Sequence, residues 1–267
     1  LDFYKEEVTC LTTWGNQLVC GLSSGRILVF ESEDVKVPPK ILKAHTTPIL
    51  HLHVWEDFLC SASKKNIHYW NKQGKDVLLI RVHKDGESGI SGLFVWNDGL
   101  CSLSSTSIKR WTVKGSLAEE FHEGGSAAAV YDKKLYLCQY QSIKIFTSPW
   151  KIAMEIPDIS IKECIRVSSD FIVTGNQQYV KLWNNKTGQF VKDLIRFICF
   201  VKFLHIWKDC ILAGAEGNAG FYMWETAKGF QEILLSEHAP SCVVDWNGKL
   251  FGGHDTRITF WKPASSK

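Results

Sequence analysis

A pattern of about 40 residues recurs seven times along the chain, and this repetition restricts the possible folds more than any other feature of the sequence. Each copy begins with an aliphatic run that ends in an aromatic residue and a tight polar turn, as in Leu11–Asn16. A run ending in small residues follows, and then a turn and a run that closes on Trp or Phe. The closing residues are Phe30, Trp70, Trp111, Phe146, Trp183, Trp224 and Trp261, at successive spacings of 40, 41, 35, 37, 41 and 37 residues.

Each copy contains three runs of alternating β-branched, aromatic and Cys residues, separated by Gly, Asn, Asp and Ser, and a less regular fourth run. Four short strands in each copy are typical of a propeller blade. Long stretches with a helical period are absent from the sequence, which excludes an α-solenoid and an α/β fold. We therefore predict an all-β chain that forms one domain over residues 1–267, a seven-bladed β-propeller of four-stranded antiparallel blades.

The two ends of the sequence indicate how the ring of blades closes. The last copy stops after its third run, Arg257–Trp261, and is one strand short. The segment Leu1–Tyr4 precedes the first copy and has the composition of a strand. We expect residues 1–6 to complete the last blade as its outer strand, which would also protect an exposed sheet edge.

The aromatic residue in the first half of each copy recurs at one position, which indicates a packing role rather than several separate binding sites. In the fifth copy Ser168 takes this position. The aromatic residues in the other copies are Trp14, Trp55, Trp96, Tyr131, Trp207 and Trp246.

Two features of the repeat resemble the WD-repeat β-propeller family. Ala44-His45 stands where the family has Gly-His, and Trp70-Asn71, Trp183-Asn184 and Trp224-Glu225 stand where it has Trp-Asp. The layout, with short first hairpins, is most similar to the propellers of F-box-type substrate receptors and plant zinc-finger/WD-repeat proteins.

The sequence departs from the family in the turn six residues before the closing aromatic residue. The structural Asp of the family is present there only as Asp255, so most copies lack the full hydrogen-bonded network. The resemblance therefore implies that apolar packing between blades carries more of the stability. The other copies have Ser24, Lys64, Ser105, Tyr140, Gln177 and Asn218 at this position.

When the innermost strands are aligned, one face is almost purely aliphatic and the other face is mixed. The simplest interpretation is that the polar side chains of the mixed face satisfy backbone groups or waters near a central channel. The alternative is a polar funnel that recognises a ligand or peptide. The channel candidates are Thr12, His53, Arg166 and His205.

Motifs for metal binding and catalysis are scarce. His51 and His53 share one strand face, but only cysteines of other copies could supply the further ligands of a tetrahedral site, so we predict no metal and no cofactor. The sequence has no GxSxG, Walker, GxGxxG or HExxH motif. His254 precedes Asp255 in a Gly-flanked turn, where the resemblance already explains the Asp. We therefore expect that the protein is not an enzyme.

The charge balance and the cysteines indicate the environment. With 31 Lys and Arg against 28 Asp and Glu, the net charge of +3 is too small to indicate nucleic acid or an anionic membrane, and no apolar run is long enough to span one. The nine cysteines are scattered and form no CxxC pair, as is typical of reduced thiols in the cytoplasm or nucleus. Because the sequence starts at Leu1 without Met, it is consistent with a domain of a longer protein.

The resemblance also implies a docking surface for other proteins or peptides. In WD-repeat propellers partners dock on the narrow top face, which consists of the turns between second and third strands and the links between blades. The mixed charges of these positions suit a peptide or a folded partner. The candidates on this rim are Arg26, His45, Lys64, Lys65, Glu87, Tyr140, Arg196, Asn218, Asp255 and Arg257.

Three functions remain open from the sequence. The first is a non-catalytic interaction scaffold or adaptor in a larger assembly, and the second is a substrate (degron) receptor of a ubiquitin ligase. For the second, the nearest match to the family's Trp-Asp-x-Arg/Lys motif is Trp183–Lys186, in which Asn replaces the acid. The third is a propeller that binds single-stranded RNA, although the basic residues are spread over different copies beside acids such as Glu123. The sequence does not indicate the oligomeric state.

Overall fold

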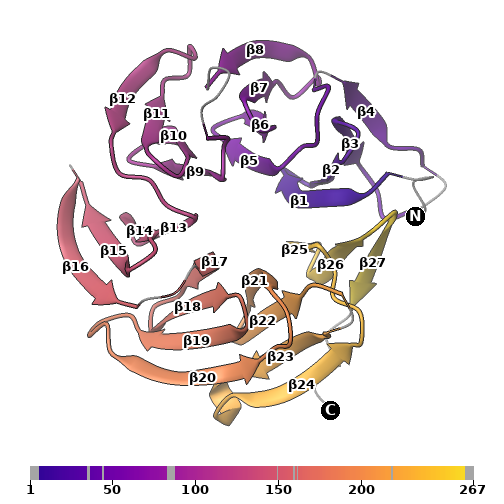
Figure 1. Cartoon of the computed structure of the whole chain (residues 1–267). Coiled ribbons are helices and arrows are strands. Elements are labelled where there is room, and N and C mark those ends of the chain that lie inside the picture. Colours follow the sequence, from indigo (N-terminus) through magenta and orange to yellow (C-terminus); the bar gives the residue numbers. More distant parts are fainter. Residues whose placement is uncertain are drawn as a thin grey trace. The chain divides into compact units, whose positions relative to one another are not determined.

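The computed structural model describes residues 6–34, 37–43, 45–82, 88–148, 150–158, 160, 162–217 and 219–261. Within these ranges it contains 27 strands in seven antiparallel sheets, and one 3-10 turn at Thr226–Lys228 (Figure 1). The sheets are the blades of a β-propeller, and the predicted fold class is confirmed. The chain divides into two compact units, Leu1–Ile90 with Pro240–Lys267, and Ser91–Ala239.

The first unit contains three blades. Within it, strand β1 lies beside both β5 and β25, so the first strands of the three blades are neighbours. The first blade consists of β1 (Val8–Trp14), β2 (Gln17–Leu22), β3 (Arg26–Phe30) and β4 (Lys40–Lys43). The second consists of β5 (His51–Trp55), β6 (Phe58–Ala62), β7 (Asn66–Trp70) and β8 (Asp76–Arg81). The seventh consists of β25 (Cys242–Trp246), β26 (Lys249–His254) and β27 (Arg257–Trp261).

The second unit contains the third to sixth blades, and its first strands β9, β13, β17 and β21 are consecutive neighbours. The third blade consists of β9 (Gly92–Trp96), β10 (Gly99–Leu103), β11 (Ile108–Trp111) and β12 (Leu117–Phe121). The fourth consists of β13 (Ala127–Tyr131), β14 (Lys134–Cys138), β15 (Ser142–Thr147) and β16 (Lys151–Pro157). The fifth consists of β17 (Lys162–Val167), β18 (Phe171–Asn176), β19 (Tyr179–Asn184) and β20 (Phe190–Arg196). The sixth consists of β21 (Val201–Trp207), β22 (Cys210–Ala215), β23 (Phe221–Glu225) and β24 (Gln231–Ser236).

The seven closing aromatic residues of the sequence pattern all lie in the third strand of a blade, at its last residue or the one before it. In the seventh blade three strands are present within the described residues. The predicted outer strand at Leu1–Tyr4 lies outside the residues that the structure describes. No helix in the described part of the chain has the length and apolar character needed to cross a membrane.

Tight turns join the first and second strands. The turn residues Asn97 and Asp98, and likewise Asp132 and Lys133, have positive φ angles between 47° and 59°. Two consecutive residues in this region form the type I′ turn, whose twist matches that of the flanking strands. Asn and Asp tolerate this conformation better than most residues, which explains why polar pairs follow the first strand.

The aromatic residues at the ends of the first strands connect neighbouring blades. The Trp14 Nε1 donates to the Asp57 carbonyl over 3.3 Å, and the Trp246 Nε1 donates to the Asn16 carbonyl over 3.0 Å. In the second unit the Trp96 Nε1 donates to the Lys133 carbonyl over 3.0 Å. In each case the acceptor is the turn of the next blade. The predicted packing role is confirmed for the five Trp residues, which are all buried: Trp14, Trp55, Trp96, Trp207 and Trp246.

Apolar clusters fill the space between neighbouring blades. One cluster in the second unit combines Val173 and Leu182 of the fifth blade with Leu204 and Ile211 of the sixth. Each such side chain is worth about 1.5 to 3 kcal/mol when it is fully buried, so these interfaces contribute more than the sparse polar contacts between blades.

A polar network inside the second blade centres on Ser61, which is fully buried. Its Oγ lies 2.8 Å from the His45 Nε2 and accepts a hydrogen bond of 2.8 Å from the Trp70 Nε1. The His45 Nδ1 is buried without a partner in the described part of the chain. Lys64, in the turn between β6 and β7, is exposed and takes no part in this network. The network therefore joins the link before β5 to two strands of the second blade.

We predict that Ser61→Ala lowers the free energy of unfolding by about 2 to 4 kcal/mol, because it leaves the Trp70 indole and the His45 ring without their shared partner. Ser102→Ala is the matched control, since Ser102 accepts only the Trp111 Nε1, over 2.9 Å. Urea unfolding of the two variants tests this, and an equal loss in both would contradict the role of His45.

Candidate functional site

The predicted rim positions differ in their surroundings. The Arg26 guanidinium is neutralised by Glu6, with 3.0 Å between Nε and Oε2. His45 is only 9% exposed and turns into the Ser61 network, so it contributes to the blade interior rather than to an accessible surface. Lys64 is exposed and Lys65 half-buried in the turn between β6 and β7. Asp255 and Arg257 are exposed at the turn between β26 and β27.

In the second unit, Tyr140 is 61% exposed in the turn between β14 and β15, and Arg196 is exposed at the end of β20. Glu87 and Asn218 lie outside the described residues, so the structure does not place these two candidates.

The channel candidates all lie on first strands, as the alignment of the copies predicts. Thr12 lies on β1 and His53 on β5, and both are half-buried. Arg166 on β17 and His205 on β21 lie on neighbouring strands of the second unit. Loss of hydration, together with the positive charge of Arg166, lowers the pKa of His205 to about 4. Burial likewise lowers the pKa of His53.

The histidine pair considered for a metal does not belong to a ligand cluster. Burial lowers the pKa of His51 to about 4, and a hydrogen bond with the Ile90 backbone opposes this shift. Among the described residues, no group of three or more His, Cys, Asp or Glu side chains is placed to hold a metal ion.

The link between β20 and β21 carries an apolar surface that the sequence did not predict. Ile198 is 88% exposed and Phe200 is 45% exposed, whereas Phe197 between the strand and Ile198 is buried. The Arg196 guanidinium lies 5.5 Å from the ring centre of Tyr179. We call Tyr179, Arg196, Ile198 and Phe200 the link surface. The sequence signal was available, because an apolar run stands here where the other links are mixed.

An open cleft with a volume of about 730 Å³ lies at the opposite end of the strands, between the fourth and fifth blades. Tyr131, Tyr136 and Met154 contribute to its walls, and Lys186 lies at its edge. It lies beside the position where the fifth copy has Ser168 and the fourth has Tyr131, in place of the Trp found in five other copies. Smaller side chains at the end of the first strand account for the unfilled space.

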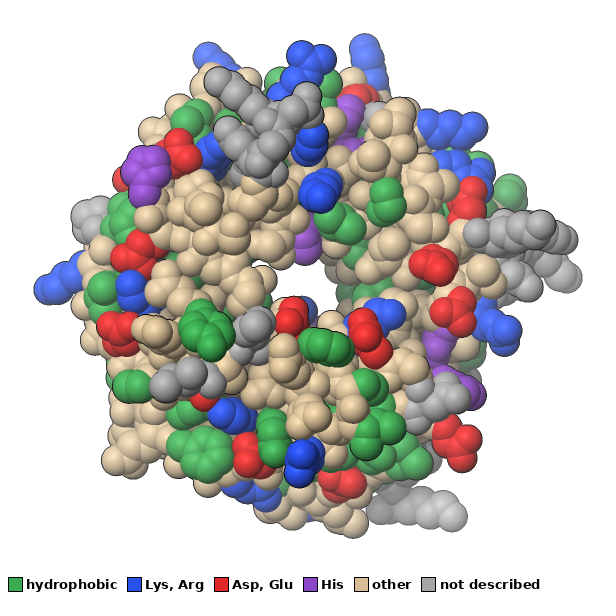
Figure 2. Space-filling model, in the orientation of Figure 1, with side chains coloured by type: hydrophobic (Ala, Val, Ile, Leu, Met, Phe, Trp, Pro, Cys, Tyr) green, Lys and Arg blue, Asp and Glu red, His purple; other side chains and the backbone are tan. Residues whose placement is uncertain are grey.

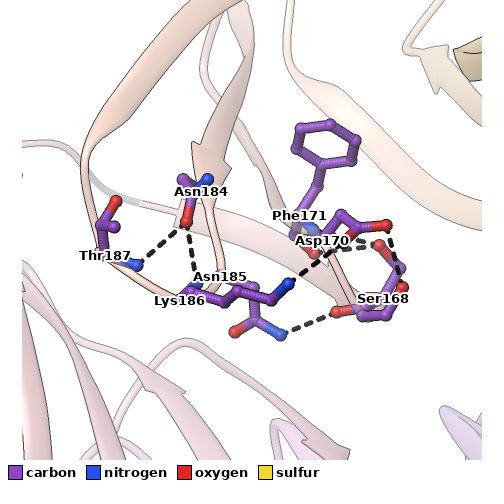
Figure 3. Close-up of polar contacts among 8 residues, drawn as sticks. Ser168, Asp170, Phe171, Asn184, Asn185, Lys186 and Thr187 are labelled. Atoms are coloured by element: carbon purple, nitrogen blue, oxygen red, sulfur yellow. Dashed lines mark hydrogen bonds and ion pairs between the residues drawn. The ribbon is translucent and has the colours of Figure 1, made fainter.

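Asn185 spans this gap between the blades. Its Nδ2 donates to the Ser168 carbonyl over 2.7 Å, and its Oδ1 accepts from the Tyr136 hydroxyl over 2.8 Å. Figure 3 shows Asn185 reaching the turn at Ser168, with Lys186 directed at Asp170 from the same loop, 3.9 Å away. The link surface and the cleft are therefore two distinct features of the second unit, at opposite ends of its strands.

On the face shown in Figure 2, the exposed charges of the described residues do not gather into a patch of a single sign. Figure 2 shows Lys and Arg side chains interspersed with acidic and neutral ones on the face in view. Several of the cations are paired, for example Lys144 with Glu123 over 2.8 Å and Lys181 with Asp158 over 2.8 Å. This distribution resembles an ordinary mixed surface more than a track for a polyanion.

Comparison with known proteins supports the fold and leaves the function open. No family model matches the sequence, and no curated protein matches it. The structure is similar to the crystal structure of the computationally designed Ika8 protein, with a TM-score of 0.71 over 98% of each chain and 15% sequence identity. At this identity the similarity concerns the fold alone.

We predict that the protein loses stability as the pH falls from about 6.5 to about 4. In the folded protein the pKa values of His45, His51 and His205 are lowered from 6.5 to about 4. The unfolded chain therefore binds more protons in this window, so the free energy of unfolding decreases as the pH falls. Each histidine contributes up to about 1.4 kcal/mol per pH unit.

Urea unfolding between pH 7 and pH 4.5 measures this slope. His205→Gln, which cannot titrate, is expected to flatten it by at most one proton. A wild-type stability that does not change over the window would contradict the lowered pKa values.

We predict that Asn185→Ala lowers the free energy of unfolding by about 1 to 3 kcal/mol, because it removes the hydrogen bond to Tyr136 of the fourth blade and the bond to the Ser168 carbonyl within the fifth blade. Asn184→Ala is the control, since the Asn184 Oδ1 accepts only from Lys186 and Thr187 in its own turn. Equal losses of unfolding free energy in the two variants, measured by urea unfolding, would show that the contact across the gap contributes no more to stability than a bond within a turn.

Proposed function

We propose that the protein is a non-catalytic interaction scaffold that docks other proteins or peptides at the turns and links of its blades. The observation that carries this proposal is the 88% exposure of Ile198 beside the half-exposed Phe200. Large apolar side chains that remain in water on a fixed link are typical of a surface that another macromolecule covers. Arg and Tyr, which lie beside them, are enriched in such interfaces.

We further infer a divergent member of the WD-repeat family that works in the cytoplasm or nucleus. The contacts among His45, Ser61 and Trp70 support the family assignment, because they join the residues on which the resemblance rests. None of the nine cysteines, all of which lie in the described part of the chain, forms a disulfide, which suits a reducing compartment.

The two other functions lack an observation of this kind. In the segment that resembles the ubiquitin-ligase adaptor motif, the Asn184 Oδ1 accepts from the backbone N–H groups of Lys186 and Thr187, both over 2.9 Å (Figure 3). These bonds are a sufficient reason for Asn at this position, since Asn stabilises such turns. Binding of RNA would require a continuous basic surface, whereas the charges of the described residues are mixed.

The proposal is tested by affinity capture from native cell extract. Charge reversal at Lys64, Arg196 and Arg257, all exposed at predicted rim positions, is expected to remove specific partner proteins. The control reverses Lys72, Lys114 and Lys186, exposed in the turns between third and fourth strands at the opposite end. Both changes alter the net charge equally, so non-specific effects of charge cancel.

Partners that are lost only with the first set support docking at these turns and links. If partners are retained by the variant changed at Lys64, Arg196 and Arg257 but lost by the control variant, the binding surface lies at the opposite end of the strands.

A further inference from the structure

The link that carries Ile198 is held in place from both sides. The Phe197 N–H donates to the Gln178 carbonyl over 2.6 Å, and the Glu216 N–H donates to the Phe200 carbonyl over 2.9 Å. The Phe197 side chain is buried between these anchors. Ile198 is β-branched and has few rotamers. A partner that covers it therefore pays little conformational entropy for immobilising this side chain.

The charge next to Ile198 is not neutralised by the protein. Among the described residues, no carboxylate lies within ion-pair distance of Arg196, whose single polar contact is a long one of 3.4 Å from its Nη2 to the Gln178 Oε1. Two arginines on third strands, Arg26 and Arg110, do have carboxylate partners, unlike Arg196 on the fourth strand β20. Arg26 pairs with Glu6, and Arg110 pairs with Glu119 at 3.2 Å.

The position of the Arg196 guanidinium is nevertheless restrained. It lies over the Tyr179 ring, 5.5 Å from the ring centre, which is a cation–π arrangement. Most of its N–H groups remain available, and a guanidinium presents them in a planar fork that matches a carboxylate.

We propose that the link surface binds a peptide segment of a partner protein in which a large apolar side chain is followed within two residues by Asp or Glu. The apolar side chain covers Ile198 and Phe200, and the carboxylate pairs with Arg196. This inference rests on the proposed function, because it names the chemistry of the partner that the scaffold holds. A phosphate of a nucleic acid would satisfy Arg196 but would leave Ile198 in water.

Fluorescein-labelled octapeptides test the proposal by fluorescence polarisation. Each peptide carries one Leu or Phe, and the residue two positions later is Glu, Gln or Lys. The peptides with Glu are expected to bind at least tenfold more tightly than those with Gln, and those with Lys most weakly. The preference for Glu is expected to shrink as salt is added, because the pair is partly exposed.

Three variants locate the binding. Arg196→Gln is expected to abolish the preference for Glu over Gln, and Ile198→Ser is expected to weaken all peptides at least tenfold. Ile152→Ser is the matched control, because Ile152 is also exposed, at 45%, but lies on the outer strand β16. Ile198, at 88% exposure, contributes little to packing, and circular dichroism checks the fold of each variant.

The outcomes separate the two proposals. A preference for Glu that Arg196→Gln removes supports the inference. Equal binding of the three peptide classes, a preference for Lys, or displacement by a uridine decanucleotide overturns it. If cell proteins still depend on Ile198 in affinity capture while no preference for Glu exists, the scaffold function stands and the partner chemistry is wrong. If neither peptide binding nor the capture of cell proteins depends on Ile198, the scaffold function and the proposed partner chemistry are both wrong.

Discussion

The packing between consecutive blades is the constraint on which the remaining structure depends. An indole from the end of one first strand enters the space beside the next blade and donates to a turn carbonyl, as Trp14 does to Asp57 and Trp96 to Lys133. Aliphatic clusters such as that around Leu204 and Ile211 fill the rest of these interfaces. Because such packing fixes the strands within each unit, the turns at both strand ends of a unit are displayed on a rigid support, which lowers the ordering cost of binding.

The two features of the second unit arise from this support in opposite ways. At the link surface some apolar side chains are not covered by the packing: Phe197 is buried, whereas Ile198 is exposed to water. The cleft is space that side chains leave unfilled, because Tyr131 and Ser168 are smaller than the Trp of other copies. Asn185 closes part of that gap with hydrogen bonds in place of apolar contact. The first feature offers an anchor to a partner, and the second is compensated within the protein.

The sequence predicted the blades because alternation, turn residues and closing aromatics repeat, and each of these has a local cause. Tertiary details were harder to predict. His45 was placed on the rim because it lies in a link between blades, but its ring turns inward to Ser61, sixteen residues away. The apolar run sets this link apart in the sequence, but Ile198 itself was missed because an apolar residue in such a run is expected to be buried. Its exposure is decided by two backbone bonds to hairpins that are distant in sequence, at Gln178 and Glu216. The cleft depends on two blades at once, so no single repeat could reveal it.

The indoles that connect the blades recognise backbone carbonyls, at Asn16, Asp57 and Lys133, and not the side chains of those residues. A carbonyl is present whatever the amino acid, so mutation of the turns leaves the connection intact. Natural drift can therefore rewrite the turns while the architecture persists. This freedom accounts for a chain that retains a familiar fold although no family model matches its sequence.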